Sequence, residues 1–190
     1  VHFQHVSTAI SFEAIRRAKA EGLPITCETA PHYLALSDEA LLKYGTLAKM
    51  NPPLRSEADR QATIAAVADG TVDLLATDHA PHLLSEKEGG ALKAMSGMPM
   101  IQFSLVSMLQ LVDEGVFTLE TIVEKMCHAP AQIYRINERG YIREGYRADL
   151  VLVRPDTPWE VTADKVLSKC GWSPLEGHLS LIHISEPTRR

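Results

Sequence analysis

Apolar and polar residues follow one another along this chain in blocks that predict strands alternating with helices. Short apolar or β-branched runs predict strands at residues 1–8, 23–29 and 72–77. Apolar positions recurring at helical spacing predict helices over residues 9–20 and 56–68, which end at Gly22 and Gly70. Strands that alternate with helices favour βα units and a parallel sheet, either closed into a barrel or open and doubly wound. The pattern therefore predicts an α/β fold.

The second half of the chain predicts further helices and then a change to β structure. Pro52 and Pro53 exclude regular structure and predict a stiff loop, and the charged, glycine-containing stretch 83–98 predicts an active-site loop. The remaining predicted elements are apolar helices at 101–111 and 119–127 and β-like segments at 141–145 and 149–153.

Composition narrows the chain to the class of soluble globular proteins. Its 190 residues are 45% hydrophobic and 23% charged, with a formal net charge of −5. This acidic balance argues against nucleic-acid and membrane-surface partners. Three cysteines without a close pair favour reduced thiols over disulfides or a cysteine-based zinc module. Because neither a leader pattern nor a membrane-length apolar run is visible, the expected location is the cytoplasm.

Residues 77–82, which read Thr-Asp-His-Ala-Pro-His, carry the strongest chemical signal. Asp78 ends a buried strand, and α/β folds and barrels keep their reactive groups at that end of the sheet. A carboxylate beside neutral imidazoles suits a divalent metal ion and proton transfer. The alternative is an aspartate that caps a turn before Pro81, with His79 and His82 on the surface.

Two further histidines are candidate ligands by residue type. His5 lies three residues after His2, so in a strand the two side chains point to opposite faces. One of them can enter a site while the other packs outside it. A lone histidine on a strand is more often structural. His32, which follows Pro31, looks like a ligand by residue type alone.

Several short motifs, taken together and in order, resemble the dihydroorotases, which are cyclic amidohydrolases of the amidohydrolase superfamily. They are the strand 1–8 that carries His5, Glu-Thr-Ala-Pro-His-Tyr-Leu at 28–34, Lys-Met-Asn-Pro-Pro-Leu-Arg at 49–55, the run 77–82, Gly-Met-Pro at 97–99 and Cys-Gly-Trp-Ser-Pro at 170–174. The resemblance extends from residue 1 to about residue 177. It stops before the segment 180–190, which looks like a translated sequencing adaptor and is expected to be a non-native tail.

The resemblance implies a fold and a division of the chain. Residues 1–138 would be the C-terminal βα units of a (β/α)8 TIM-type barrel, and residues 139–179 would return to a small β-sandwich. The first strand here would be the sixth of the barrel, so an N-terminal half would be missing. That half would supply the remaining metal ligands, and the chain by itself is expected to be inactive.

The resemblance also implies an activity, the zinc-dependent, reversible cyclisation of N-carbamoyl-L-aspartate to L-dihydroorotate in de novo pyrimidine biosynthesis. One or two zinc ions would be bound, with His5 and Asp78 among the ligands. Asp78 would also be the general base and acid that moves a proton from the attacking hydroxide to the leaving ring nitrogen. His32 would lie past the seventh strand, without a metal role.

Four further residues would contact the substrate if the resemblance holds. Asn51 would read the ring, His82 would bind the carboxylate, and the loop residues Ser96 and Gly97 would approach the ring through their backbone. Asn51 has an alternative role in capping the turn before Pro52. A homo-oligomer is compatible with the resemblance.

Two alternative functions stay open. Allantoinases and dihydropyrimidinases share the Glu-Thr-x-Pro segment, but they usually lack the counterparts of Asn51 and His82. A catalytically dead amidohydrolase-like subunit that scaffolds a partner enzyme is the other alternative. Such subunits tend to lose metal ligands, whereas His5 and Asp78 are both present here.

Overall fold

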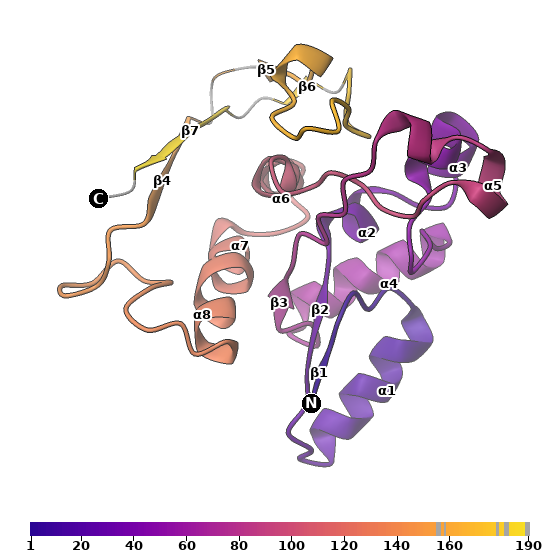
Figure 1. Cartoon of the computed structure of the whole chain (residues 1–190). Coiled ribbons are helices and arrows are strands. Elements are labelled where there is room, and N and C mark those ends of the chain that lie inside the picture. Colours follow the sequence, from indigo (N-terminus) through magenta and orange to yellow (C-terminus); the bar gives the residue numbers. More distant parts are fainter. Residues whose placement is uncertain (155–156, 158, 178, 181–182, 189–190) are drawn as a thin grey trace.

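Three short parallel strands lie at the centre of the N-terminal part of the molecule. The computed structural model describes residues 1–154, 157, 159–177, 179–180 and 183–188. The strands are β1 (His2–Phe3), β2 (Thr26–Thr29) and β3 (Leu74–Leu75), and they form one sheet in the order β1-β2-β3. Their register pairs His2 with Thr26 and Glu28 with Leu74. The predicted βα units and parallel sheet are confirmed (Figure 1).

The strands are shorter than the apolar runs that predicted them. At the end of β1 the chain leaves the extended conformation at His5, whose φ is 41°, and after β3 it does so at Asp78, whose φ is 43°. Backbone hydrogen bonds nevertheless continue past the strand ends. The amide of Val6 donates to the carbonyl of Glu28 (2.8 Å), and that of Ala76 donates to the carbonyl of Thr29 (2.9 Å).

Helices α1 (Ala9–Ala20) and α4 (Glu57–Ala68) connect these strands; α1 begins at the predicted residue and α4 begins one residue later, with Ser56 as its N-cap. Thr8 caps α1 by accepting a hydrogen bond from the amide of Ser11, and Ser56 caps α4 by accepting one from the amide of Asp59. Asp59 also accepts a hydrogen bond from the amide of Ala9 (2.9 Å), which ties the start of α1 to the first turn of α4.

The remaining helical elements surround this sheet and its following loops. They are α2 (Pro31–Ala35), α3 (Ala40–Tyr44), η1 (Gly45–Ala48), η2 (Leu84–Lys87), α5 (Gly90–Lys93), α6 (Ser104–Asp113), α7 (Leu119–Val123), the π-helical turn η3 (Glu124–His128) and α8 (Ala129–Ile133). Apolar side chains of α1, β2, α4 and α6 form the main core, which includes Phe12, Cys27, Val67 and Met108. No helix within the described residues combines the length and apolar character that crossing a membrane requires.

The C-terminal part forms two small antiparallel ribbons apart from the parallel sheet (Figure 1). Strand β4 (Leu150–Arg154) pairs with β7 (His183–Thr188), and β5 (Trp159–Glu160) pairs with β6 (Leu179–Ser180); the short helix η4 (Ala163–Lys165) lies between β5 and β6 in sequence. The strand expected at 149–153 is thus present. The one expected at 141–145 is wrong, because these residues form a bend, an irregular stretch and a turn at 144–145. Residues 181–182 and 189–190 of the expected tail lie outside the described residues.

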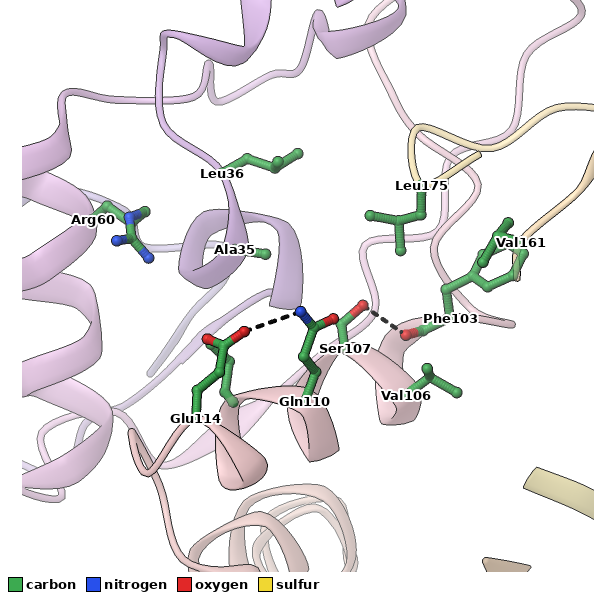
Figure 2. Close-up of a pocket in the computed structure, with 11 residues that line it drawn as sticks. Ala35, Leu36, Arg60, Phe103, Val106, Ser107, Gln110, Glu114, Val161 and Leu175 are labelled. Atoms are coloured by element: carbon green, nitrogen blue, oxygen red, sulfur yellow. Dashed lines mark hydrogen bonds between the residues drawn. The ribbon is translucent and has the colours of Figure 1, made fainter. Parts of the chain in front are cut away.

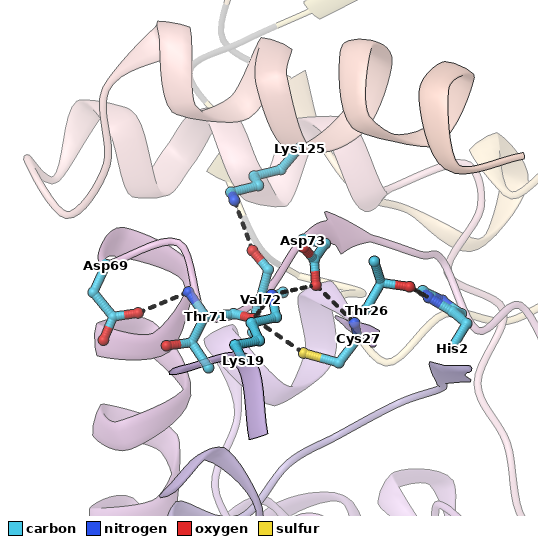
Figure 3. Close-up of polar contacts among 9 residues, drawn as sticks. All are labelled: His2, Lys19, Thr26, Cys27, Asp69, Thr71, Val72, Asp73 and Lys125. Atoms are coloured by element: carbon cyan, nitrogen blue, oxygen red, sulfur yellow. Dashed lines mark hydrogen bonds and ion pairs between the residues drawn. The ribbon is translucent and has the colours of Figure 1, made fainter. Parts of the chain in front are cut away.

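A cluster of polar contacts joins α1, β2 and the turn before β3 (Figure 3). The carboxylate of Asp73 accepts hydrogen bonds from the ammonium of Lys19 and the amide of Cys27, both at 2.7 Å. The ammonium of Lys125 donates to the carbonyl of Val72 (2.6 Å). These contacts hold the turn before β3 against α1, β2 and the helical turn that carries Lys125.

Candidate functional site

The carboxyl ends of the three parallel strands bring together His5, His32 and Asp78. His5 follows β1, His32 lies in the first turn of α2 directly after β2, and Asp78 follows β3. His5 acts electrostatically on both of the others, and His32 forms a close pair with Asp78. Reactive groups in parallel α/β sheets gather at this edge, so these three side chains define the candidate site.

The backbone is strained at two of these residues. His5 and Asp78 have φ angles of 41° and 43°, in the left-handed region that L-residues rarely adopt. Such conformations raise the energy of the folded state by on the order of 1–3 kcal/mol and persist mainly where a functional arrangement requires them. Both residues singled out from the sequence as metal ligands are therefore held in a conformation that local preferences alone disfavour.

The carboxylate of Asp78 is only partly satisfied. Its Oδ2 atom is buried and has no hydrogen-bond partner among the described residues. Burial raises the pKa of this carboxyl group above its ordinary value; Glu28 acts in the same direction, whereas His5 lowers the pKa. A buried anionic oxygen without a donor is costly unless a cation or a proton compensates it, so this atom is suited to binding a metal ion or holding a transferable proton.

His32 is the buried neighbour of Asp78. Its side chain is fully buried, and its Nε2 atom lies 3.7 Å from Oδ2 of Asp78. Neither ring nitrogen has a hydrogen-bond partner within the described part of the chain. Burial, followed by the influence of His5, lowers the pKa of His32 to about 3. A neutral imidazole therefore borders the carboxylate.

Sequence reasoning left His32 out of the site, although a signal for it was present. His32 follows the end of β2 in the same way that Asp78 follows the end of β3, so both occupy the sheet edge where chemistry collects. Its neighbour Tyr33 donates a hydrogen bond from its hydroxyl to the carbonyl of Pro52 (2.7 Å), next to Asn51.

His2, in contrast, has a structural environment. Its Nδ1 atom pairs with the hydroxyl of Thr26 (2.7 Å), and its Nε2 atom lies 2.9 Å from a carboxylate oxygen of Glu28. The hydroxyl of Tyr134 donates to the same oxygen (3.1 Å). Both ring nitrogens of His2 thus have partners in the protein. Of the two strand histidines, His2 is therefore the one that packs outside the site.

The loop residues named as substrate contacts lie close to one another. Nε2 of His82 donates to the carbonyl of Ser96 at 3.0 Å. A Cβ atom at Gly97 would lie 2.5 Å from the carbonyl oxygen of Ala80 and 3.2 Å from the ring of His82. Only glycine fits at this contact, where φ is 141°. His82, Ser96 and Gly97 therefore form one compact surface next to Asp78.

Asn51 lies on an exposed loop beside that surface. The amide of Gly97 donates to the carbonyl of Lys49 (2.9 Å), which holds the loop of Asn51 against the segment of Ser96 and Gly97. His79, which neighbours Asp78 in sequence, accepts a hydrogen bond at Nδ1 from the amide of Ile101 (3.1 Å). The Nδ1 atom of His79 therefore already has a partner in the protein.

The donor chemistry of His5 and Asp78 fits a zinc ion, but the set is incomplete within this chain. An imidazole and a carboxylate are both common zinc ligands, and the unpartnered Oδ2 of Asp78 is available to a cation. Within residues 1–154 and the other described segments, no group of three or more His, Cys, Asp and Glu side chains is arranged to hold a metal ion. A catalytic zinc generally has three protein ligands, so further ligands are needed.

A separate pocket lies between α6 and the segment after α2 (Figure 2). Its polar side chains already have partners in the protein, since Gln110 donates to Glu114 (3.0 Å) and the guanidinium of Arg60 binds Glu57 and the carbonyl of Leu34. It contains none of the residues at the carboxyl edge of the sheet. We therefore place the candidate site at His5, His32 and Asp78 and not in this pocket.

Comparison with known sequences gives concordant matches. The model of the Amidohydrolase family matches residues 2–173. A dihydroorotase of Geobacter metallireducens is 48% identical over 177 residues, and one of Acetivibrio thermocellus is 43% identical over 178 residues. Each alignment covers 93% of this chain and 42% of the relative. The chain thus spans less than half the length of these curated relatives.

Solved structures of similar fold include hydantoinases. L-hydantoinase (dihydropyrimidinase) from Arthrobacter aurescens superposes with a TM-score of 0.90 at 30% identity, covering 95% of this chain and 41% of that structure. A D-hydantoinase superposes with a TM-score of 0.91 at 25% identity, covering 99% of this chain and 43% of that structure. The amidohydrolase α/β fold predicted from the sequence is confirmed by these matches.

Proposed function

Because this chain belongs to the amidohydrolase family, we propose that it is part of a dihydroorotase, which interconverts N-carbamoyl-L-aspartate and L-dihydroorotate. The observation that carries the proposal is the pair His5 and Asp78, which follow the carboxyl ends of β1 and β3 on either side of β2, with Oδ2 of Asp78 buried and unpartnered among the described residues. The identity of 48% to a dihydroorotase supports the choice of substrate within the family.

His5 and Asp78 are the residues of this chain that would hold zinc. When bound, zinc polarises the amide carbonyl and increases the acidity of a water molecule. We expect the other ligands from the part of the relatives' length that this chain does not cover. On this proposal the number of zinc ions, one or two, depends on those ligands.

Asp78 is the proton carrier of the proposed reaction. In the hydrolytic direction its carboxylate takes a proton from the attacking water and gives it to the ring nitrogen as the amide C–N bond breaks. Burial raises the pKa of this carboxyl group, which brings it closer to the neutral range where an acid–base catalyst is effective. In the direction of ring closure the same group acts in the reverse order.

His82, Asn51 and the backbone of Ser96 and Gly97 would recognise the substrate. Nε2 of His82 donates to the carbonyl of Ser96 (3.0 Å), so His82 could bind the substrate carboxylate through Nδ1, which lies 3.8 Å from Glu86, only as an imidazolium with both nitrogens protonated. The exposed amide of Asn51 offers both a donor and an acceptor, the combination that a ring with alternating N–H and C=O groups requires.

The proposal has structural consequences beyond the site. Residues 1–138 are the C-terminal βα units of a TIM-type barrel, residues 139–179 return to a β-sandwich, and residues 180–190 are a non-native tail. On this proposal the protein acts in the cytoplasm on a small molecule in pyrimidine biosynthesis, and a homo-oligomeric assembly is compatible with it. A direct check of the domain division is limited proteolysis, which should cleave near residue 139 and after residue 179.

A hydantoinase-type activity is the second candidate function, and the superposition on L-hydantoinase at a TM-score of 0.90 favours it. Cyclic ureides without a carboxylate, such as dihydrouracil and hydantoin, would then be the substrates. Asn51 and His82 favour dihydroorotase, because they match its motifs. An inactive scaffold subunit is the third reading, and the intact pair His5 and Asp78 argues against it.

The decisive experiment compares substrates on the full-length protein that carries this chain. We expect kcat/KM for dihydroorotate to exceed that for dihydrouracil, hydantoin and allantoin by at least about 100-fold, because unpaired polar groups in a pocket strongly disfavour the wrong ligand. His82→Ala should reduce kcat/KM for dihydroorotate alone. Preference for hydantoin or dihydrouracil would establish the second candidate, and zinc binding without any hydrolysis would establish the scaffold.

A further inference from the structure

Lys87 is a buried cation that the proposed reaction does not use. It ends η2, and its side chain is 1% exposed. The ammonium donates to the carbonyls of Met95 (2.8 Å), Gly97 (2.9 Å) and Lys49 (3.2 Å). Three hydrogen bonds employ all three donors of a lysine ammonium, so backbone dipoles from two separate segments surround the charge.

Trp172 covers this cation from the C-terminal part of the chain. The ammonium of Lys87 lies 5.7 Å from the centre of the indole ring, a distance compatible with a cation–π interaction. The indole Nε1 atom donates to the carbonyl of His82 at 2.7 Å. Burial, together with Lys49, lowers the pKa of Lys87 to about 8, which leaves the group mainly protonated at pH 7. Trp172 thus contacts both the cation and the backbone of a proposed substrate residue.

The segments that meet at Lys87 are those of the proposed substrate surface. Gly97 and the adjacent Ser96 receive the ring of His82, and Lys49 lies two residues before Asn51. The amide of Gly97 donates to the same Lys49 carbonyl that Lys87 binds. One buried ammonium therefore ties the Asn51 loop to the Ser96–Gly97 segment.

We propose that Lys87, covered by Trp172, is a positioning residue that sets the spacing between Asn51 and Ser96–Gly97 and so determines how tightly the substrate ring is bound. This inference rests on the proposed function for its substrate. Its structural part, the joining of the two segments, is independent of any activity. None of the contacts described for Lys87 involves His5 or Asp78. Replacing the Lys87 side chain should therefore leave metal binding intact.

The first test is hydrogen exchange on the full-length protein with Lys87→Met, which retains the aliphatic stem and removes the donors. The matched control is Lys93→Met, since Lys93 is an exposed lysine of the same stretch. Exchange at the amides of Met95 and Gly97 should accelerate by at least about tenfold in Lys87→Met and stay unchanged in the control, because local opening follows the lost contacts. Equal exchange rates in the two variants would overturn the proposal.

The second test separates positioning from general damage by kinetics. Lys87→Met should raise KM for dihydroorotate about tenfold at unchanged zinc content, with a smaller change in kcat. A merely structural residue would lower the fraction of active enzyme, and that reduces kcat and leaves KM unchanged. That outcome would overturn the proposal.

A third variant covers the case in which Lys87→Met does not fold. Lys87→Arg retains the charge, but its planar guanidinium cannot direct three donors as an ammonium does. We expect it to fold and to raise KM; a wild-type KM would contradict the proposal. If the wild-type protein hydrolyses no dihydroorotate, the proposed function fails, while hydrogen exchange in Lys87→Met or Lys87→Arg still decides the role of Lys87.

Discussion

The Nε2 atom of His32 lies 3.7 Å from the Oδ2 atom of Asp78, and both atoms are buried without a hydrogen-bond partner among the described residues. The two side chains come from the ends of adjacent parallel strands. An unpartnered imidazole beside an unpartnered carboxylate is unfavourable by itself. The arrangement becomes favourable when a cation or a substrate supplies the missing partner, and this is how we interpret the site.

Asp78→Asn should abolish turnover in the full-length protein with little change in stability, because the amide can neither carry the proton nor supply the ligand charge. General acid–base catalysis is typically worth about 100-fold or more. The measurement is kcat for dihydroorotate. Asp73→Asn is a suitable control, since Asp73 binds Lys19 and the amide of Cys27 and should affect stability and not kcat. If Asp78→Asn retains more than about a tenth of kcat, a loss below about 1.4 kcal/mol, the assigned role is wrong.

His32→Leu should lower kcat by roughly tenfold, about 1.4 kcal/mol, because it replaces the polar neighbour of Asp78 by an apolar one. His32→Gln retains an N–H donor at a similar reach and should lose less activity. Both variants should be assayed at equal zinc content, so that a lost ligand is distinguished from a misplaced carboxylate. Equal kcat in His32→Leu and the wild-type protein would show that His32 only fills space.

Gly97→Ala should destabilise the protein by about 1–3 kcal/mol, because the added methyl group would lie 2.5 Å from the carbonyl oxygen of Ala80. Gly70→Ala is the control for backbone strain alone, since Gly70 also has a positive φ but no heavy atom within 4 Å of the added Cβ. Urea unfolding of both variants gives the comparison. A loss in Gly97→Ala no larger than in Gly70→Ala would contradict the close contact.

Cys27 should resist alkylation while the protein is folded, and its titration should lower stability at high pH. Burial, with Asp73 as the next cause, raises the pKa of its thiol to about 11. An unfolded thiol loses its proton near pH 8.5. Between these values the unfolded state binds fewer protons, so stability falls as the pH rises. In Cys27→Ser this contribution should be absent, and a comparison of urea unfolding at pH 8 and pH 10 measures it.

A wild-type protein whose unfolding free energy changes between pH 8 and pH 10 by the same amount as that of Cys27→Ser would contradict the buried thiol. The alkylation experiment is an independent check. Mass spectrometry should find Cys27 unmodified in the folded protein and modified after unfolding in urea, whereas the exposed Cys127 should react in both states.

The amino-acid sequence by itself determined the features that depend on neighbours in the chain. Helices α1 and α4 begin after Thr8 and Ser56 because a hydroxyl can cap the amides of the next turn. The strand end before Asp78 was predicted because the apolar run 72–77 stops there, whereas His5 was predicted inside a strand and instead follows the end of β1. The roles of His5, Asp78, Asn51, His82, Ser96 and Gly97 in metal or substrate binding stay predictions.

Tertiary structure decided what depends on contacts between distant segments. The segment 141–145, predicted as a strand, is a bend, an irregular stretch and a turn, since a β-like pattern forms a strand only where a partner strand is available. The pairing of β2 with β3 brings His32 to Asp78, and the folding of the loop after β3 surrounds Lys87 with carbonyls from Lys49, Met95 and Gly97. Residue type and spacing do not encode these neighbours, because burial and sheet order arise only when the whole chain packs.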